Sequence, residues 1–430
     1  MKAKISIIMP SYNVVEYIDK CLDSVLSQNL KDIEIICIDA NSVDGTTDIL
    51  KKYANSDGRI QIINSEKKSY GAQVNRGIDA SSGEYIAILE TDDCISCGMY
   101  ERLYDSARLY SLDYCKMNWQ SFSLVKNGYR YCENRIWDDK NRYGCILIPS
   151  EDEKISTCDC TIWSGIYDRN FIINNNIRLN ESPGAAYQDI GFLMQVYEKA
   201  ERAMYIDEIG YCYRYNRPGA STWNKNVLKY VTDEWNYLEE LGIISERVLL
   251  RLCASFLCET DKLLKMVGFD SNSPLITPYL LWVSDKMQGI ENAYLGSETD
   301  NSFCRLKMMI SDFKNYVDLA KTKFENDEGI KQQISDFLNG ADCIIFGSGS
   351  YGRRLYNLLE WTSENIMCYC DNSAERIGDK IGAYDILLPA DAIKQYPHCK
   401  FIIANKNSAV PMKKQINEYG ISDADIFVYC

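Results

Sequence analysis

The chain has 430 residues, 46% of them hydrophobic, which is typical of a globular protein long enough for two or three domains. Its formal net charge is −14 and it has no run of Lys and Arg, which disfavours a nucleic-acid partner because phosphate contacts need clustered positive charge. No apolar stretch reaches the about 18 residues that span a bilayer, and residues 1–13 have too short an apolar core for a signal peptide. We therefore expect a cytoplasmic protein without a transmembrane segment.

The cysteine and histidine content limits the kinds of catalytic and metal site that the sequence predicts. In a reducing compartment most of the eighteen cysteines serve as small buried hydrophobes. The C-x-x-C pair Cys94 and Cys97 has no second pair at zinc-site spacing, which makes it a weak signal for a metal or redox role. His398 is the single histidine, so the usual catalytic triads and His-rich metal sites are excluded. The sequence therefore predicts chemistry that runs on carboxylates.

Apolar stretches alternate with amphipathic stretches through the first hundred residues. The apolar stretches are 4–10, 33–39, 59–64 and 84–90, and the helical ones are about 16–28, 46–53, 72–80 and 98–110. Short apolar strands separated by helices predict a mostly parallel, Rossmann-like sheet that is covered on both faces. Ligands bind such sheets at the carboxyl ends of the strands, and the polar clusters "PSYN", "DANS" and "ETDD" fall there.

The stretch "ETDD" places Glu90, Asp92 and Asp93 within four positions. Crowded carboxylates repel one another unless a cation or hydrogen-bond donors compensate them. One interpretation is a solvated turn or a helix cap. The other interpretation is a site for Mn²⁺ or Mg²⁺ on Asp92 and Asp93, because these ions bind carboxylate and diphosphate oxygens together. The position of the stretch at the predicted ligand-binding edge of the sheet favours this metal site.

The rest of the chain changes character twice. Residues 112–222 are rich in Tyr and Trp, and residues 224–331 show a helical period without Gly or Pro punctuation. A new strand–helix series begins just after Gly340. We predict an α/β domain over 1–222, a helical region over 223–338 and a small Rossmann-like α/β domain over 339–430.

Four stretches in order resemble the family 2 glycosyltransferases, which have the GT-A fold: residues 7–28, 33–50, 70–93 and 187–192. The resemblance covers about the first 220 residues. It implies an inverting, metal-dependent transferase with a nucleotide-sugar donor. It places Pro10, Tyr12 and Asp39 at the base and ribose of the nucleotide. It also puts "ETDD" at the metal-binding DxD element, with Asp92 and Asp93 nearest the ribose and the metal.

The resemblance also indicates a catalytic base. "YQDIGF" resembles the segment that carries it, and Asp189 falls on the base position, although a cap of the following helix is the alternative. Arg214 and Arg217 follow the region in which family members have basic residues that cover the diphosphate. A guanidinium can donate two hydrogen bonds to phosphate oxygens, so both arginines are candidates to bind the diphosphate. The alternative is two surface charges beside a Pro-Gly turn.

Two further predictions concern ligand contacts. Asn75 and Arg76 stand in a glycine-bearing loop that enters a helix, which suits the nucleotide sugar, although a plain helix start fits the same pattern. Trp163 is a candidate platform for an acceptor sugar ring, with a core tryptophan as the alternative.

Three positions depart from the family pattern. Ala40 replaces an acidic residue, Asn41 a glycine, and Glu90 the first Asp of the metal element. The main hypothesis is a hexosyltransferase-type enzyme that moves a sugar from a UDP-sugar to a glycan or lipid-linked acceptor in bacterial surface or capsular polysaccharide synthesis. It would work in the cytoplasm. The sequence leaves open a peripheral association with the inner face of the membrane, and it also leaves open a homo-oligomer. The alternative is a catalytically degenerate sensor or scaffold that binds nucleotide sugars.

The stretch "FGSGSYG" places Gly347, Gly349 and Gly352 in a G-x-G-x-x-G frame, with Asp371 ending the next predicted strand. The segment resembles the small Rossmann-like domains appended to enzymes of bacterial surface-polysaccharide synthesis. A second nucleotide site is one interpretation of these four residues. The other is a structural or oligomerising domain whose glycines allow tight helix–strand packing.

Overall fold

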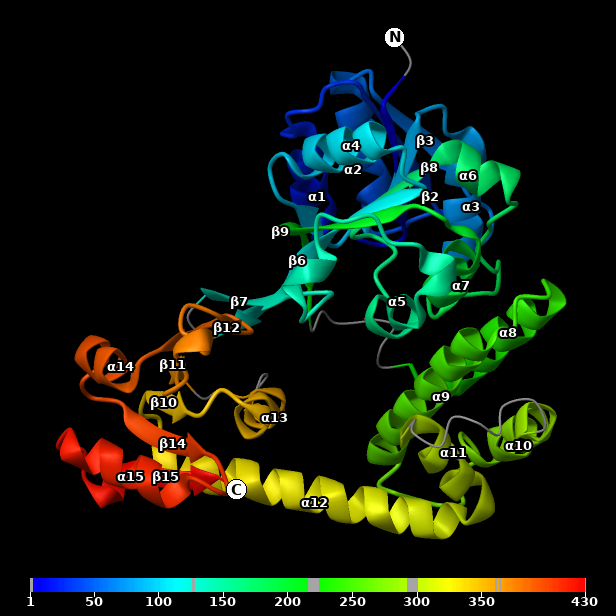
Figure 1. The fold of residues 1–430 in the computed structure, drawn as a ribbon. Coiled ribbons are helices and arrows are strands. Elements are labelled where there is room, and N and C mark those ends of the chain that lie inside the picture. The colour runs from blue at the N-terminus through cyan, green and yellow to red at the C-terminus, as the bar shows by residue number, and fades with distance from the viewer. Residues whose placement is uncertain are drawn as a thin grey trace. The chain divides into compact units, whose positions relative to one another are not determined.

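The computed structural model describes residues 3–125, 128–215, 224–291, 301–359, 362 and 365–429. The chain divides into two compact units, residues 1–317 and 318–430. The boundary falls within the long helix α12 (Phe313–Leu338), drawn in yellow in Figure 1. Most of the predicted helical region thus belongs to the same unit as the predicted transferase domain.

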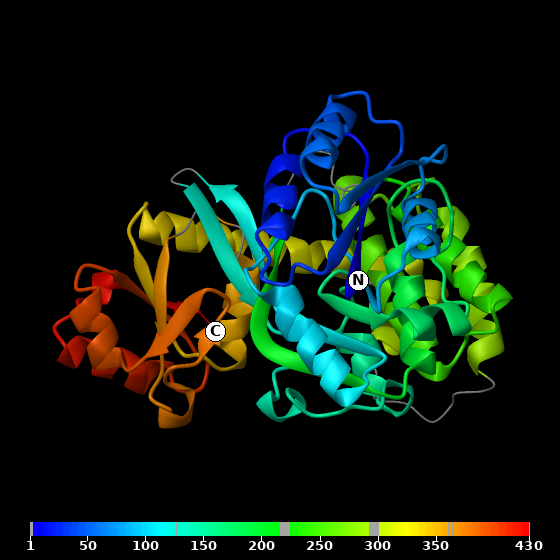
Figure 2. The same ribbon diagram turned by 90° about the horizontal axis from the view of Figure 1, so that it is seen from above.

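Among the described residues, nine strands form the sheet of the first unit, in the order β3-β2-β1-β4-β8-β6-β9-β5, with β7 paired to β6. They are β1 (Ile5–Ser11), β2 (Ile33–Asp39), β3 (Ile60–Asn64), β4 (Tyr85–Ile88), β5 (Cys94–Ile95), β6 (Tyr114–Val125), β7 (Gly128–Asn134), β8 (Gly165–Asp168) and β9 (Ala203–Arg214). The first four pair in parallel, as the apolar pattern predicts. The later half is mixed: β8 is antiparallel to β4 and β6, whereas the long strands β6 and β9 run parallel, side by side (Figure 2).

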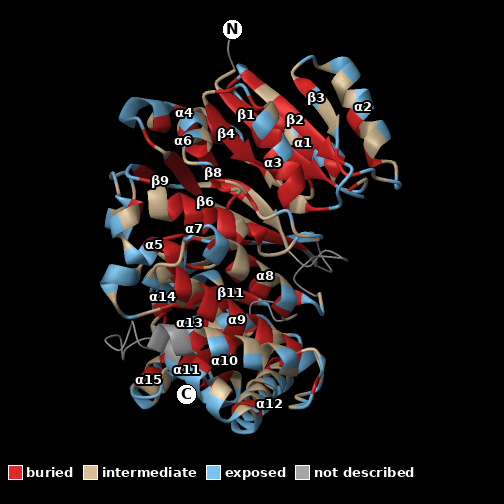
Figure 3. Cartoon of the chain, turned by 90° about the vertical axis from the view of Figure 1, so that its right-hand side faces the viewer, coloured by how far each residue is buried: buried red, intermediate tan, exposed pale blue. Residues whose placement is uncertain are grey.

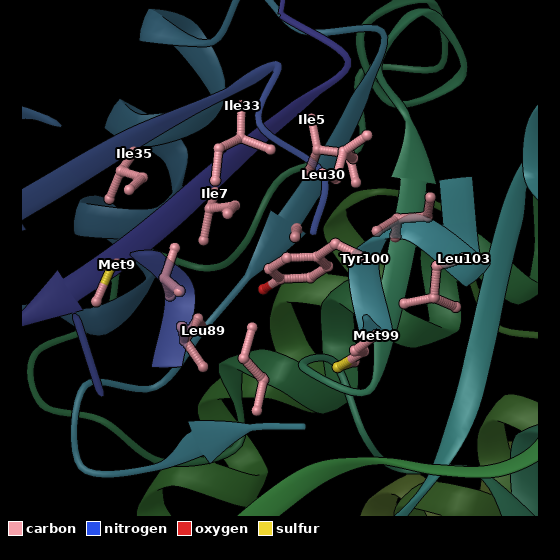
Figure 4. Close-up of a cluster of buried hydrophobic side chains, with 14 of the residues drawn as sticks. Ile5, Ile7, Met9, Leu30, Ile33, Ile35, Leu89, Met99, Tyr100 and Leu103 are labelled. Carbon is pink, nitrogen blue, oxygen red and sulfur yellow. The ribbon is translucent and has the colours of Figure 1, made fainter. Parts of the chain in front are cut away.

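Helices cover both faces of the parallel half. They and the neighbouring helices are α1 (Ile18–Leu26), α2 (Thr46–Ser56), α3 (Tyr70–Ala80), α4 (Met99–Tyr110), α5 (Glu153–Cys158), α6 (Arg169–Asn174) and α7 (Gln188–Lys199). Side chains alternate along a strand. Ile5, Ile7 and Met9 therefore join the core with α1 and α4 (Figure 4), while Ile8 faces α3. Gly77 of α3 makes this approach possible, because a Cβ there would lie 2.3 Å from Ile8. Burial on both faces explains the near-continuous apolar character of β1, β2 and β4, which are mostly red in Figure 3.

The first unit ends in a helical region. Its helices are α8 (Val227–Glu240), α9 (Glu246–Met266), α10 (Thr277–Glu291) and α11 (Asn301–Ser311), followed by the start of α12. Trp235 and Phe256 are fully buried, and the ring of Trp282 lies edge-on to Trp235 with centroids 5.3 Å apart. Within the described ranges, no helix combines the length and apolar character needed to cross a bilayer.

The second unit is a smaller α/β domain. Its sheet has the order β12-β13-β11-β10-β14-β15, parallel except for the β12–β13 pair. The elements are β10 (Cys343–Phe346), α13 (Ser350–Leu359), β11 (Ile366–Cys370), β12 (Lys380–Ile381), β13 (Tyr384–Leu387), α14 (Pro389–Gln395), β14 (Lys400–Ala404), α15 (Ala409–Glu418) and β15 (Ile426–Tyr429). Hydrophobic clusters lie on both faces, as in the predicted Rossmann-like arrangement.

Candidate active site

The acidic stretch after β4 is stabilised by hydrogen-bond donors from other parts of the chain. Asp93 is 1% exposed and accepts hydrogen bonds from the Tyr211 hydroxyl at 2.8 Å and the Arg214 backbone N–H at 2.6 Å. Glu90 accepts one from the Tyr70 hydroxyl at 2.5 Å. Burial and the charge on Asp92 still raise the pKa of Asp93 well above its usual value. The crowded charge is thus tolerated because β9 and α3 supply donors.

This geometry separates the two residues predicted to hold the metal. Both oxygens of Asp93 are engaged by Tyr211 and Arg214, whereas Asp92 is partly exposed. In the described part of the chain, no cluster of three or more His, Cys, Asp and Glu side chains is arranged to hold a metal ion. A bound Mn²⁺ or Mg²⁺ would therefore use Asp92 together with diphosphate and water oxygens, a donor set that suits these ions. The metal roles of both residues stay predictions, and the geometry favours Asp92.

The residues predicted at the base and ribose lie at the carboxyl ends of adjacent strands. Pro10 pairs with Ile38 in the β1–β2 register, next to Asp39. Asp39 is buried and accepts hydrogen bonds from the hydroxyls of Ser42 and Thr47, both at 2.6 Å. Tyr12 is 40% exposed, with the Lys68 amine 2.8 Å from its hydroxyl. Pro10 and Asp39 therefore lie together at this edge of the sheet, and their contact with a nucleotide stays a prediction.

Ala40 and Asn41 begin the loop after β2. Ala40 is fully buried, and its N–H donates to the Ser11 carbonyl at 3.0 Å. Asn41 takes a positive φ of 58°, a conformation that glycine and asparagine tolerate. Asparagine at the family's glycine position thus fits the backbone, whereas Ala40 presents no polar group.

The loop that enters α3 has a structural role. The Asn75 amide donates to the Leu179 carbonyl and accepts from the Leu179 N–H, both at 2.9 Å, so its polar atoms are used within the protein. Arg76 is exposed. Tyr70 N–H donates to the Gly184 carbonyl at 2.9 Å, and Ser69 and Gly184 form a parallel β-bridge. These bonds hold the segment that leads to Asp189 against the start of α3.

Asp189 lies in the first turn of α7. Burial raises its pKa, while the Ile190 N–H and the charge of Arg251 oppose that shift. Burial, followed by the charges of Glu90 and Asp189, raises the pKa of Tyr70 well above its usual value. Two carboxylates from distant parts of the chain therefore act on one tyrosine: Glu90 accepts its hydrogen bond, and Asp189 lies near enough to act electrostatically. The role of Asp189 as the base stays a prediction.

Arg214 is held beside the acidic stretch. Its Nε donates to the Asp92 carbonyl at 2.8 Å, and its guanidinium lies 4.7 Å from the Tyr17 ring centroid and 4.6 Å from that of Phe122. Arg217 lies outside the described residues. Arg214 thus supports the backbone of Asp92, and its contact with a diphosphate stays a prediction.

Residues that sequence reasoning missed carry much of this geometry. Tyr70 and Tyr211 bind the acidic stretch, yet no spacing rule connects either to it. Trp163 stacks on Tyr211 at a centroid distance of 4.2 Å and on Tyr213 at 5.5 Å. It therefore belongs to an aromatic cluster next to the carboxylates, and its contact with an acceptor stays a prediction.

A cavity of about 370 Å³ lies in the second unit at the carboxyl ends of the parallel strands, lined by Gly347, Gly349, Asp371 and Arg376 among others. Gly347 has φ +110°. A Cβ at Gly352 would lie 2.0 Å from the Gly347 carbonyl oxygen, so the frame needs this glycine. Asp371 accepts from the Ser348 N–H at 2.8 Å, the Ser348 hydroxyl at 2.6 Å and the Ser373 N–H at 2.9 Å. Its carboxylate thus holds the loop that lines the cavity.

Two family models match parts of this chain. A model described as Glycosyl transferase family 2 matches residues 6–169, and one described as C2185-like, N-terminal matches residues 340–427. A Bacillus subtilis protein named as the uncharacterized glycosyltransferase EpsJ is 30% identical over 220 residues, which cover 49% of this chain and 61% of that protein. A cholesterol galactosyltransferase of Borreliella burgdorferi is 28% identical over 255 residues, covering 57% of this chain and 70% of that one. The chain thus spans about three fifths of the Bacillus relative's length.

Solved structures support the fold. S. aureus TarS 1–349 in complex with UDP-GlcNAc matches with a TM-score of 0.55 at 18% identity, over 75% of this chain and 92% of that one. The sheet, with its parallel half and its mixed half, is that of the GT-A fold. Together with the family model and the named relatives, this confirms the resemblance seen in the sequence. Residues 6–169 of this chain are thus a glycosyltransferase family 2 domain.

Proposed function

We propose that the first unit transfers a sugar, with inversion, from a UDP-sugar to a glycan acceptor in the synthesis of a bacterial surface polysaccharide. The observation that carries the proposal is that Tyr70 donates a hydrogen bond to Glu90 and also feels the charge of Asp189. Glu90 belongs to the donor-side acidic stretch, and Asp189 begins a helix from a later part of the chain. A donor-side carboxylate and a separate base within one site are what a single displacement needs.

In the proposed reaction, Asp189 takes the proton of an acceptor hydroxyl. The hydroxyl oxygen then forms a bond to the anomeric carbon on the face opposite the nucleotide, and the bond from that carbon to the UDP oxygen breaks. Burial makes Asp189 a stronger base than an exposed carboxylate by raising its pKa, while the charge of Arg251 favours the ionised form. A divalent cation on Asp92, when bound, neutralises charge on the departing diphosphate.

The choice of nucleotide and of biological process rests on relatives. S. aureus TarS 1–349 is known in complex with UDP-GlcNAc, and one Bacillus subtilis relative is named as a putative teichuronic acid biosynthesis glycosyltransferase, 42% identical over 94 residues. Asp39 and Tyr12 stand at the strand ends where a base and ribose would bind. These observations favour UDP as the first nucleotide to test.

The test is a calorimetric titration of the full chain with UDP in Mn²⁺, repeated in EDTA. We expect binding that requires both the metal and Asp92, so Asp92→Ala should lose it. Asp105→Ala removes an exposed carboxylate of α4 and serves as the matched control. Binding that is equal in Mn²⁺ and EDTA would contradict the metal role of Asp92.

Turnover of UDP-sugars is the second arm. Asp189→Asn should abolish transfer and leave UDP affinity unchanged. UDP binding by the unaltered chain without turnover of any donor would favour the sensor or scaffold alternative, for which the loss of a polar group at Ala40 is the structural reason. Retained turnover in Asp189→Asn would refute the base assignment.

A further inference from the structure

Tyr187 has an unusual backbone conformation. Its φ is +68°, although it is a bulky residue, and it is the N-cap of α7, two positions before Asp189. Most other non-glycine residues with positive φ in the described ranges are asparagines, which tolerate the left-handed region. Such a conformation persists only where surrounding contacts hold it. The start of α7 therefore requires a tertiary partner.

That partner is Glu259 of α9. The Tyr187 hydroxyl donates to Glu259 Oε1 at 2.5 Å, and the Lys262 amine also contacts Oε1 at 2.5 Å. Glu259 is 2% exposed, so its carboxylate is fixed in the interior of the unit. A hydrogen bond to a buried charged group is stronger than a neutral one. The bond ties the residue before the first turn of α7 to the middle of a long, well-packed helix.

One further close approach and one electrostatic interaction connect the first turn of α7 to the helical region. A Cβ on Gly191 would lie 1.6 Å from Glu234 Oε1, so the glycine lets the α8 carboxyl pack directly against α7. Arg251 of α9 acts electrostatically on Asp189. Helices α8 and α9, like α7 itself, lie beyond the residues matched by the family model, and each supplies a side chain that acts on the start of α7.

We propose that Tyr187 and Glu259 form a positioning pair for Asp189: the hydrogen bond holds Tyr187 in the left-handed conformation, and this conformation aims the first turn of α7 at the acceptor. The inference rests on the proposed function, in which Asp189 is the base. Without the bond Tyr187 relaxes to a negative φ, and the direction of the first turn changes. We expect donor binding to be unaffected, because the residues proposed to bind the donor lie on β1, β2, the stretch after β4 and β9, and none of these lies on α7.

The test removes one oxygen atom. Tyr187→Phe keeps the ring and deletes the hydroxyl, and we expect kcat to fall about tenfold to a hundredfold, since small displacements of a catalytic group have effects of this size. KM for the donor and the affinity for UDP should not change. Tyr316→Phe is the matched control, because Tyr316 donates to Asp261 of the same helix at 2.6 Å. Glu259→Gln retains an acceptor oxygen and should keep more activity than Glu259→Ala.

A readout without turnover separates this inference from the proposed function. Hydrogen–deuterium exchange of the peptide that spans residues 186–193 should rise in Tyr187→Phe and stay unchanged in Tyr316→Phe. Unaltered exchange in Tyr187→Phe would overturn the positioning role, and so would a loss of kcat equal to that of Tyr316→Phe. An unaltered chain that turns over no UDP-sugar, with the exchange result as expected, would instead count against the proposed function alone.

Discussion

Tyr211 links two parts of the candidate site that lie more than a hundred residues apart in the sequence. Its hydroxyl donates to Asp93 Oδ2 at 2.8 Å and accepts from the Glu90 N–H at 3.3 Å. One side chain of β9 thus stabilises the carboxylate and the backbone of the acidic stretch. The consequence is that the geometry of this stretch depends on β9.

Removal of this hydroxyl should therefore destabilise the first unit. In Tyr211→Phe the buried Asp93 loses one of its donors, and an unsatisfied buried group costs about 1–3 kcal/mol. Urea unfolding measures the change. Tyr213→Phe is the control on the same strand, since Tyr213 is half-buried and the hydroxyl that donates to Asp93 is that of Tyr211. Equal stability of Tyr211→Phe and the unaltered chain would contradict this account.

Glu234 should make stability depend on pH. Burial raises its pKa to about 8, above its usual 4.5. Between these two values the unfolded chain releases the proton and the folded chain keeps it, so stability falls as pH rises from 4.5 to 8, by about 1.4 kcal/mol per unit. Glu234→Gln should remove this fall. The free energy of unfolding of the variant, relative to that of the unaltered chain, should therefore increase from pH 5.5 to pH 8.5.

Urea unfolding at pH 5.5 and at pH 8.5 measures the free energy of unfolding of Glu234→Gln and of the unaltered chain. Glu240→Gln, at the exposed end of the same helix, is the control and should show no pH-dependent gain. A constant difference between Glu234→Gln and the unaltered chain would show that Glu234 is ionised in the folded state at pH 7.

A buried ion pair supports the mixed half of the sheet. Lys116 and Asp159 are both fully buried, 2.6 Å apart, and the Lys116 amine also donates to the Thr161 carbonyl and the Tyr197 hydroxyl. Lys116→Met leaves Asp159 without its cation, and loss of one partner of such a pair costs about 3–5 kcal/mol. The double variant Lys116→Met with Asp159→Asn should recover part of this loss. A loss under about 1 kcal/mol in thermal or urea unfolding would contradict the expectation.

Gly352 of α13 should tolerate no side chain. A Cβ there meets the Gly347 carbonyl at 2.0 Å, and backbone atoms cannot move aside as a flexible side chain can. We expect Gly352→Ala to destabilise the second unit by about 1–3 kcal/mol. Gly329→Ala of α12 is the control, because nothing lies within 4 Å of its Cβ position, and it should be neutral or stabilising by up to about 1 kcal/mol. Urea unfolding followed by hydrogen exchange in residues 343–370 locates the effect.

Local patterns in the sequence were enough for the four strands of the parallel half and for the edge of the sheet at which the site is predicted. Seven-residue apolar runs such as Ile5–Ser11 predict strands buried on both faces, and such strands pair in parallel with crossover helices. The carboxyl ends of parallel strands share one edge, so the sequence alone predicts that Asp39 and Asp92 lie together there. The glycine frame of the second unit is likewise visible in the sequence, because its spacing follows from one strand–turn–helix unit.

The partners of the carboxylates were decided only by the tertiary structure. Asp92 and Asp93 are adjacent and chemically alike in the sequence, yet β9 encloses Asp93 and leaves Asp92 partly exposed. The left-handed conformation of Tyr187 and its bond to Glu259 join segments 72 residues apart. Strand and helix patterns arise from neighbours a few residues away, whereas burial and hydrogen-bond partners depend on which distant elements pack together. Sequence periodicity therefore located the edge of the sheet, and packing alone determined which side chains at that edge are open to a ligand.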